Sequence, residues 1–475
     1  MAKDEASSPP TIFPGEGSSK EVYSGGFCFR FDRAFSGKGV MTFYPKFLYF
    51  VLFASLASAV PFLALFWEAK GLDKWQIGLI AGVRPFISFV TAPLWGFLAD
   101  RTQQHKPLMA LSCLLAAFMM LLLWEAEGFV GITLVMVLLA ATEAPVGPLL
   151  DNTVLLWLHS SGGGKENYGR ERLWGAISWG LLALIMGYVL SIASTWFWGL
   201  AVYAIGMLLF VLALWLSRIS FPEVQALPAW REVRVLLANG RVVSFFFTIF
   251  IMGMGFCIIS SFLFLFLREI GGSELLMGLS LVFTVATEIP FFFYAGWALR
   301  RFGVHALLVT AMLAYLLRLL AYSYLNHAWL VLPFELLHGL TFGATWAAGI
   351  HHTSSLAPRG LEATAQTIFG GLFSGLGGFV GAVFGGWLYE RWGPRVMFRV
   401  LAVLIGLNTL LFCWTEREVL FASLSRRRGG RWLRWREEDG GGESSECAEK
   451  EEDKDSYLQL EREGEAWRIS KEEVK

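Results

Sequence analysis

Hydrophobic positions follow one another in long runs, and short polar segments separate the runs. About 20 consecutive apolar residues are enough for a helix to cross the hydrocarbon core of a bilayer. We therefore expect an all-α multi-pass membrane protein. The runs predict twelve transmembrane helices, at 44–67, 75–99, 107–125, 128–156, 173–193, 196–216, 243–267, 275–299, 304–325, 328–352, 363–389 and 394–414.

A longer polar segment falls between the sixth and seventh runs and divides the helices into six plus six. The tail after the last run is polar, first basic and then acidic and glycine-rich, a composition typical of disorder. The predicted organisation is a polar N-terminal segment, two six-helix bundles joined by a linker, and a disordered tail. These parts occupy 1–43, 44–216, 217–242, 243–414 and 415–475.

The composition supports a membrane protein and argues against other functional classes of protein. Hydrophobic residues make up 55% of the chain and charged residues 16%, whereas soluble domains average about 45–50% and about 25%. The formal net charge is zero, so nothing indicates a nucleic-acid partner. The cysteines are scattered without metal-ligand spacing, and we find no nucleophile–base pair. We therefore expect no cofactor, no metal and no enzymatic activity.

The distribution of lysine and arginine predicts the orientation in the membrane. The loops on one side carry most of them, including Arg101, Lys106, Lys165, Arg170 and Arg172 and four arginines of the linker. The positive-inside rule then places both termini in the cytoplasm. The plasma membrane and an organelle membrane both remain open, and we expect a monomer in the lipid bilayer.

Several charged residues lie inside the predicted spans. A charge near the bilayer centre costs at least about 2.5–3.5 kcal/mol, so it needs a partner and usually has a function. Arg318 and Glu335 each lie seven residues from the outer end of adjacent spans, at a depth of roughly 10 Å. We expect them to form an ion pair. His338 lies one helical turn beyond Glu335, and Glu288 lies near the midplane.

One face of the span at 328–352 combines polar and titratable residues. A carboxylate and imidazoles pack badly against lipid, so we expect this face to line a water-accessible cavity. Trp346, in the same span, can stack on a ring of a solute. The residues at i, i+3 and i+7 spacing are Glu335, His338, Phe342, Thr345, Gly349 and His352.

The first half carries its own buried charges. Arg84 and Glu143 lie at mid-depth and are candidates for the substrate cavity, while Asp151 lies nearer the cytoplasmic edge. Asp151 can pair with Arg170 or Arg172 in a structural or gating role. The alternative for all these charges is that they form structural ion pairs that hold helices together.

A short motif at the end of the second span, closing on two charged residues, recurs in the second half. The run Gly96-Phe97-Leu98-Ala99-Asp100-Arg101 leads into a loop, and Gly296-Trp297-Ala298-Leu299-Arg300-Arg301 occupies the same position after the eighth span. Such repetition indicates two related halves, the plan on which many secondary transporters are built.

The twelve spans, the division into six plus six and the motif Gly96-x-x-x-Asp100-Arg101 together resemble the major facilitator superfamily. Other stretches narrow the resemblance to the branch that contains phenylpropionate permeases and the associated-domain membrane proteins of eukaryotes, near lactose permease and the nucleoside:proton symporters. The resemblance covers about 45–415 and rests on the stretches 148–152, 168–175, 288–290, 299–303, 317–319 and 336–342.

The resemblance implies a latch at this motif. Gly96 would allow close helix approach, and Asp100 would meet the N-terminus of a helix in the other half. Arg101 would complete a charge relay, with Lys106 substituting for a later basic residue of the family. The second copy keeps Gly296 and Arg301 but has an arginine in place of the aspartate, so its motif is degenerate.

The resemblance also implies proton coupling. Relatives of lactose permease use a glutamate on the eighth helix, an arginine on the ninth and a histidine–glutamate pair on the tenth. Glu288, Arg318, Glu335 and His338 match in residue type and helix, with the order on the tenth helix reversed. Arg84 or Arg318 can meet an anionic group of a solute.

These observations lead to one hypothesis and one alternative. The hypothesis is a proton-coupled secondary transporter whose halves rock about a central cavity that binds a small organic solute. Burial and the Arg318 charge act in opposite senses on the proton affinity of Glu288 or Glu335, so solute binding can change it. The alternative is a receptor or scaffold that uses the same fold without transport.

Overall fold

The computed structural model describes residues 37–102, 104–160, 168–193, 195–217, 240–356 and 362–417. Most of the N-terminal segment, the linker and the tail predicted from sequence therefore lie outside the described residues. The chain divides into two compact units at Tyr44. The first is described only over 37–44, where the first helix begins, and the following text concerns the second unit, Pro45–Lys475.

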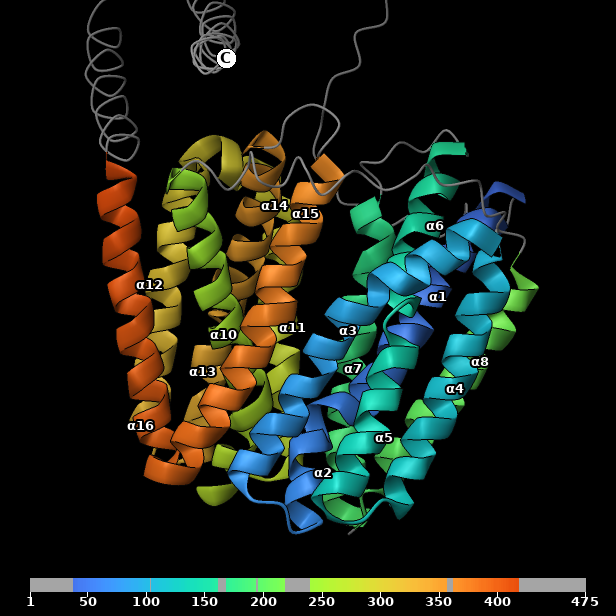
Figure 1. The fold of residues 1–475 in the computed structure, drawn as a ribbon, viewed down its shortest axis with the longest axis horizontal. Coiled ribbons are helices and arrows are strands. Elements are labelled where there is room, and N and C mark those ends of the chain that lie inside the picture. Colours follow the sequence, from blue (N-terminus) through green and yellow to red (C-terminus); the bar gives the residue numbers. More distant parts are fainter. Residues whose placement is uncertain are drawn as a thin grey trace, which may run out of the picture. The chain divides into compact units, whose positions relative to one another are not determined.

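The first half of this unit is helical throughout its described part (Figure 1). Pro61 lies in a 3-10 turn between α1 and α2, and Pro145 lies between α5 and α6. Proline lacks a backbone N–H, so it interrupts the helical hydrogen bonds within these two spans. The helices are α1 (Gly37–Ala59), α2 (Leu63–Ala69), α3 (Lys74–Thr102), α4 (His105–Glu125), α5 (Gly128–Glu143), α6 (Val146–Ser160), α7 (Tyr168–Ala193) and α8 (Phe197–Leu216).

The second half contains two helices with π-helical stretches, at Gly339–Gly343 and Gly371–Leu376. Its longest helix turns at Gly393, whose φ of 81° suits glycine. The helices are α10 (Gly240–Glu269), α11 (Glu274–Phe302), α12 (Val304–Ser323), α13 (Leu332–Glu335), α14 (Ala344–Leu356), α15 (Glu362–Gly370) and α16 (Gly377–Thr415).

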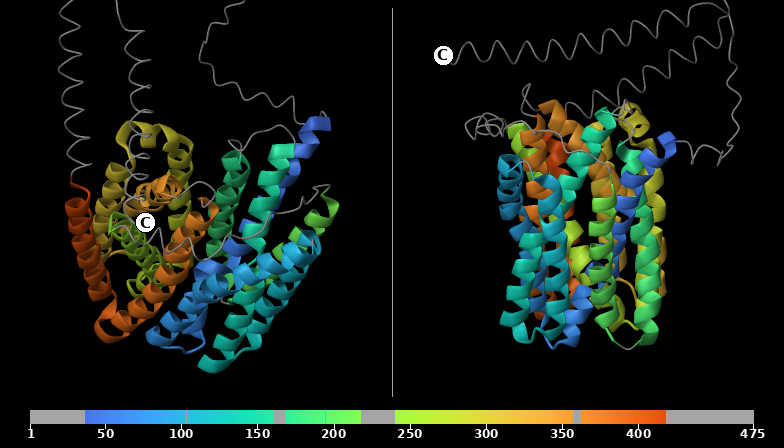
Figure 2. Two further views of the ribbon diagram at one scale, coloured as in Figure 1. Left: turned by 45° about the horizontal axis from the view of Figure 1, so that its top comes forward. Right: turned by 90° about the vertical axis from the view of Figure 1, so that its right-hand side faces the viewer.

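The described helices are consistent with the twelve predicted spans. Within the described residues, ten stretches are long and apolar enough to cross a membrane. The longest of them, Ala365–Thr415, includes the turn at Gly393 and so accounts for two spans. The remaining span, 328–356, is divided among a 3-10 turn, α13, a π-helical stretch and α14. We call 328–356 the broken helix. Figure 2 shows the helices from two further directions.

The two halves pack tightly at one end of the membrane domain. We call it the Lys74 end, because α3 begins there, and the opposite end the Arg101 end. A Cβ atom added to Gly78 in α3 would lie 2.6 Å from the carbonyl oxygen of Ala382 in α16, and one at Gly187 in α7 would lie 2.5 Å from that of Glu274 in α11. Glycine therefore permits a backbone approach that alanine would prevent.

Charged pairs also join the halves at the Lys74 end. The Lys74 ammonium forms an ion pair with Glu68 of its own half and lies 3.9 Å from Glu269 Oε1 of the other half. The Lys74 backbone N–H donates to Glu390 Oε2 at 2.9 Å. Arg268 Nη1 lies 3.8 Å from Glu68 Oε2 and adds another pair between the halves.

The contact between α3 and the second half does not extend to the Arg101 end. Phe89 still packs on the second half, where a Cβ at Gly375 would lie 2.9 Å from the Phe89 Cβ. A Cβ at Gly96 would meet nothing within 4 Å, and Phe97 is 57% exposed. The close approach expected at Gly96 is thus absent from this conformation. The halves meet at the Lys74 end instead, where α3 and α16 lie side by side (Figure 1).

Candidate functional site

Arg318 of α12 is the centre of a buried polar cluster in the second half. Its side chain is only 4% exposed, and Nη2 donates to Glu335 Oε2 at 2.5 Å. Nη1 donates to Thr341 Oγ1 at 3.1 Å, and Nε donates to the Tyr322 hydroxyl, which in turn donates to the Glu335 carboxylate. The predicted Arg318–Glu335 ion pair is present, and its hydrogen bonds offset part of the cost of burying two charges.

His338 links this cluster to Glu288 of α11. Arg318 Nη1 lies 3.2 Å from His338 Nδ1. Arginine carries only donors, so Nδ1 accepts, and a neutral imidazole then has its proton on Nε2. Nε2 lies 3.6 Å from Glu288 Oε2. The ring therefore directs its N–H at a carboxylate that is 19% exposed, whereas the Glu335 side chain is 2% exposed.

The polar face predicted for the broken helix is interrupted. The helix is interrupted by a turn at 336–337 and is π-helical over Gly339–Gly343. A π turn holds more residues than an α turn, so the residues after it lie on a different face. Thr345 is fully buried, and Gly349 packs under the Phe369 ring. The expectation that the whole face lines a cavity is therefore wrong.

Trp346 belongs to an aromatic cluster in the second half. Its ring lies 5.6 Å from Phe342 and 5.3 Å from Phe369, measured between ring centroids. Phe342 in turn stacks on the His338 ring at 5.5 Å. Trp346 and Phe342 are half-buried, while Phe369 is buried. The cluster thus extends from the core to the titratable residues.

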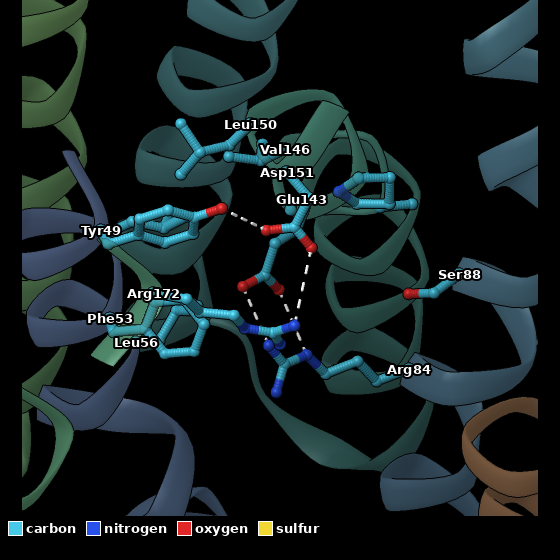
Figure 3. A pocket seen from close by; sticks show the side chains of 14 residues that line it. Tyr49, Phe53, Leu56, Arg84, Ser88, Glu143, Val146, Leu150, Asp151 and Arg172 are labelled. Carbon is cyan, nitrogen blue, oxygen red and sulfur yellow. Dashed lines mark hydrogen bonds and ion pairs between the residues drawn. The ribbon is translucent and has the colours of Figure 1, made fainter. Parts of the chain in front are cut away.

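The first half encloses a cavity of about 220 Å³ with charged walls (Figure 3). Arg84 of α3 and Glu143 at the end of α5 form a two-pronged ion pair across it. Arg84 Nη2 donates to Glu143 Oε1 at 2.9 Å, and Nε donates to Oε2 at 3.2 Å. The two residues that the sequence placed at mid-depth therefore meet.

A second charged group lines the same cavity. The Tyr49 hydroxyl of α1 donates to Asp151 Oδ1 of α6 at 2.7 Å, and Arg172 Nη1 of α7 lies 3.9 Å from Asp151 Oδ2 (Figure 3). Of the two arginines proposed as partners of Asp151, the structure places Arg172 beside it, and Arg170 is exposed. Each of the two cations in the cavity wall thus has a carboxylate neighbour.

Of the residues assigned to a latch, Lys106 makes its described contacts within the first half. Lys106 Nζ donates to the Ser217 carbonyl at 3.0 Å, just past the end of α8, and lies 5.4 Å from the Trp215 ring. This contact stays within the first half, where a cation suits a helix C-terminus. Arg101, Gly296 and Arg301 are exposed, and the side chain of Asp100 lies outside the described residues.

Sequence reasoning missed several polar partners. Tyr322 lies four residues after Arg318, on the same face of a helix, and this spacing was a usable signal. Tyr49 and Thr341 gave no such signal, because their partners lie on other helices or across an irregular turn. Over the described residues, no group of three or more histidine, cysteine, aspartate or glutamate side chains is arranged to hold a metal ion.

Comparisons with known proteins agree with this architecture. The model of the family described as "MFS_1 like family" matches residues 44–400. The maltose permease of Geobacillus stearothermophilus is 28% identical over 375 residues, which cover 78% of this chain and 93% of the permease. A major facilitator superfamily domain-containing protein 6-like of Mus musculus is 29% identical over 188 residues, 39% of this chain and 32% of that protein.

The fold agrees with solved structures as well. A crystal structure of a mutant of the nucleoside transporter NupG superimposes with a TM-score of 0.71 at 18% identity, covering 78% of this chain and 98% of that one. The predicted all-α fold of a multi-pass membrane protein is therefore confirmed. The chain belongs to the MFS_1 like family, and it is a secondary transporter with the major facilitator fold.

Proposed function

We propose that this transporter moves a small, uncharged polar solute together with a proton, by alternating access. The observation that carries the proposal is the contact of Glu288 Oε2 with His338 Nε2 at 3.6 Å. It gives a partly buried carboxylate inside the membrane domain a polar neighbour without a full ion pair. Such a carboxylate can bind and release a proton while the rest of the cluster keeps its contacts.

Glu288 suits the role of proton carrier better than Glu335. Glu335 is held by Arg318 and Tyr322 and is almost fully buried. A proton on Glu335 would leave the Arg318 charge unpaired in the interior, which is costly. A proton on Glu288 leaves the pair intact. Of the two carboxylates that the sequence left open, the contacts favour Glu288.

Arg172 can link the binding of the solute to the binding of the proton. It borders the cavity beside Asp151, and its helix, α7, packs against α11, the helix of the other half that carries Glu288. A solute that hydrogen-bonds to Arg172 or Asp151 changes the field at Glu288 and with it the proton affinity of the carboxylate. This link connects the two halves, and alternating access requires coupling between them.

The charge balance of the cavity favours an uncharged solute. Arg84 and Arg172 already lie beside Glu143 and Asp151, and Arg318 is buried with its own partners. An anionic solute would have to break one of these pairs, whereas hydroxyl groups can hydrogen-bond to both partners at once. The names of the related maltose permease and of the NupG nucleoside transporter also refer to uncharged solutes.

We further propose that the protein is a monomer with both termini in the cytoplasm, in the plasma membrane or an organelle membrane. The positive-inside rule supports this orientation, since the Arg101 end carries the excess of lysine and arginine. The conformation is then one in which the halves are joined at the outer end.

Uptake into proteoliposomes tests the proposal. Labelled sugars and nucleosides are compared with aromatic acids, with and without an inward proton gradient, and the accepted solute is then used with Glu288→Gln. We expect this variant to lose accumulation against a gradient but to keep solute exchange. Glu274→Gln is the matched control, because it lies on the same helix at the Lys74 end. Accumulation by Glu288→Gln at the wild-type level would contradict the proposal.

A further inference from the structure

The broken helix departs from α-helical geometry on both sides of His338. The departures within 336–343 are a turn at 336–337 and the π-helical stretch Gly339–Gly343. We call 336–343 the irregular segment. π-helical turns are rare and often mark functional sites. Where the backbone changes from one helical geometry to another, a backbone group can lose its partner within the helix, and it then needs a partner elsewhere.

The neighbouring helix α11 supplies one of these partners. The backbone N–H of Gly339 donates to Thr287 Oγ1 at 3.2 Å, while the Thr287 hydroxyl itself donates to the Thr284 carbonyl at 3.1 Å. The residue after Thr287 is Glu288, which contacts His338, the residue before Gly339. Two consecutive residues of α11 therefore hold two consecutive residues of the irregular segment.

The two backbones are in close contact at the same place. A Cβ atom on Gly339 would lie 2.6 Å from the carbonyl oxygen of Thr287. A backbone oxygen in a helix cannot move aside as a flexible side chain can. Two features therefore fix the distance between α11 and the segment. One is the hydrogen bond from Gly339 to Thr287, and the other is the absence of a side chain at Gly339.

We propose that Thr287 is a positioning residue for proton coupling, whose hydroxyl holds the irregular segment so that His338 Nε2 faces Glu288. The inference rests on the proposed function of Glu288. Thr287 does not itself bind the proton. Loss of the Thr287 hydroxyl would let the segment move away from α11. The Nε2–H of the His338 ring would then stabilise the Glu288 carboxylate less.

The other charged groups around this pair are held by partners other than Thr287. Arg318 of α12 acts on His338 Nδ1, and it is in turn held by Glu335 and Tyr322. From the first half, Arg172 lies on α7, which packs against α11, and it is beside Asp151. None of these groups hydrogen-bonds to Thr287, so the direct effect of a change at Thr287 is on the Gly339 N–H and, through the segment, on the Glu288–His338 contact.

The test is Thr287→Val, which keeps the shape of the side chain and removes the hydroxyl. Thr284→Val is the matched control, since the Thr284 hydroxyl bonds only the Leu281 carbonyl of its own helix, at 2.7 Å. Thr287→Ser retains a hydroxyl and should restore the wild-type behaviour. Should Thr287→Val fail to reach the membrane, Thr287→Ala provides the same comparison.

The readout is the pH dependence of solute uptake, with solute exchange and the amount of folded transporter measured in parallel. A less stabilised carboxylate holds its proton up to a higher pH. We expect the midpoint of uptake to move upward by about half a pH unit or more in Thr287→Val. Thr284→Val and Thr287→Ser should keep the wild-type midpoint, and exchange should continue in all variants.

The outcomes separate this inference from the proposed function. A wild-type protein whose uptake ignores the proton gradient would overturn proton coupling and the role of Thr287 with it. A proton-coupled wild type whose midpoint is unchanged in Thr287→Val or Thr287→Ala would overturn the role of Thr287 alone.

Discussion

Arg318 and Glu335 form a buried ion pair, and its role differs from that of the less deeply buried carboxylate of Glu288. The pair is closed by Tyr322 and Thr341 and has almost no contact with solvent. Removal of one partner of a buried pair leaves the other charge unpaired, which typically costs about 3–5 kcal/mol. We therefore assign Glu335 to the stability of the second half.

This assignment predicts a large loss of stability for Glu335→Gln. Thermal unfolding in detergent should show a clearly lowered transition, corresponding to about 3–5 kcal/mol. Glu288→Gln is the control and should change the transition little, because Glu288 has only the 3.6 Å contact with His338. A stable Glu335→Gln protein that has lost proton-driven uptake would instead make Glu335 the proton carrier.

Some of these contacts were predictable from sequence. Equal depth on adjacent spans was enough to pair Arg318 with Glu335, because both positions could be counted from the ends of apolar runs. The direction of the His338 ring was not predictable. It depends on which nitrogen accepts from Arg318, and the irregular backbone around His338 decides that.

At the scale of helices, hydropathy gave most of the boundaries but none of the irregularities. The spans expected at 107–125 and 196–216 correspond to His105–Glu125 and Phe197–Leu216. Hydropathy predicts one regular helix over 328–352, and a regular helix extends the polar face over more turns than the structure does. Apolar runs report length and burial, and they contain no signal for a change from α to π geometry.

The tight contact between α11 and the broken helix predicts that Gly339→Ala is destabilising. Its methyl group would overlap the Thr287 carbonyl, and overpacking of this kind costs about 1–3 kcal/mol. Gly296→Ala is the control, since a Cβ there meets only the Arg300 side chain at 3.6 Å. We expect a lower unfolding temperature for Gly339→Ala alone. Equal stability of the two variants would show that the contact is loose.

At the scale of the whole membrane domain, the two halves are joined at the Lys74 end. Lys74 and Arg268 each pair across the halves, and glycines in α3 and α7 allow backbone contact there. The sequence motif drew attention to the Arg101 end, because a latch is expected there in the family. In alternating access the halves close at either end in turn, and this conformation is closed at the Lys74 end. A sequence motif can mark an end that closes, but it does not indicate which end is closed in a given conformation.

Lys74→Gln should weaken closure at this end. Partly exposed ion pairs contribute up to about 1 kcal/mol, so the ratio of closed to open molecules should fall by up to roughly fivefold. Spin labels on Gln76→Cys and Trp387→Cys, on α3 and α16, would report a larger share of long distances. Lys70→Gln is the control, because Lys70 binds the Trp124 carbonyl within the first half. Unchanged distances in Lys74→Gln would exclude Lys74 from the closure.

Proton binding by Glu288 is the central claim, and proton movement driven by solute tests it most directly. An accepted sugar or nucleoside is added to lightly buffered proteoliposomes while the external pH is recorded. We expect the wild type to make the medium more alkaline as solute enters, and Glu288→Gln to exchange solute without any pH change. Solute-driven proton uptake by Glu288→Gln would contradict the claim, as would its absence from a wild type that transports the solute.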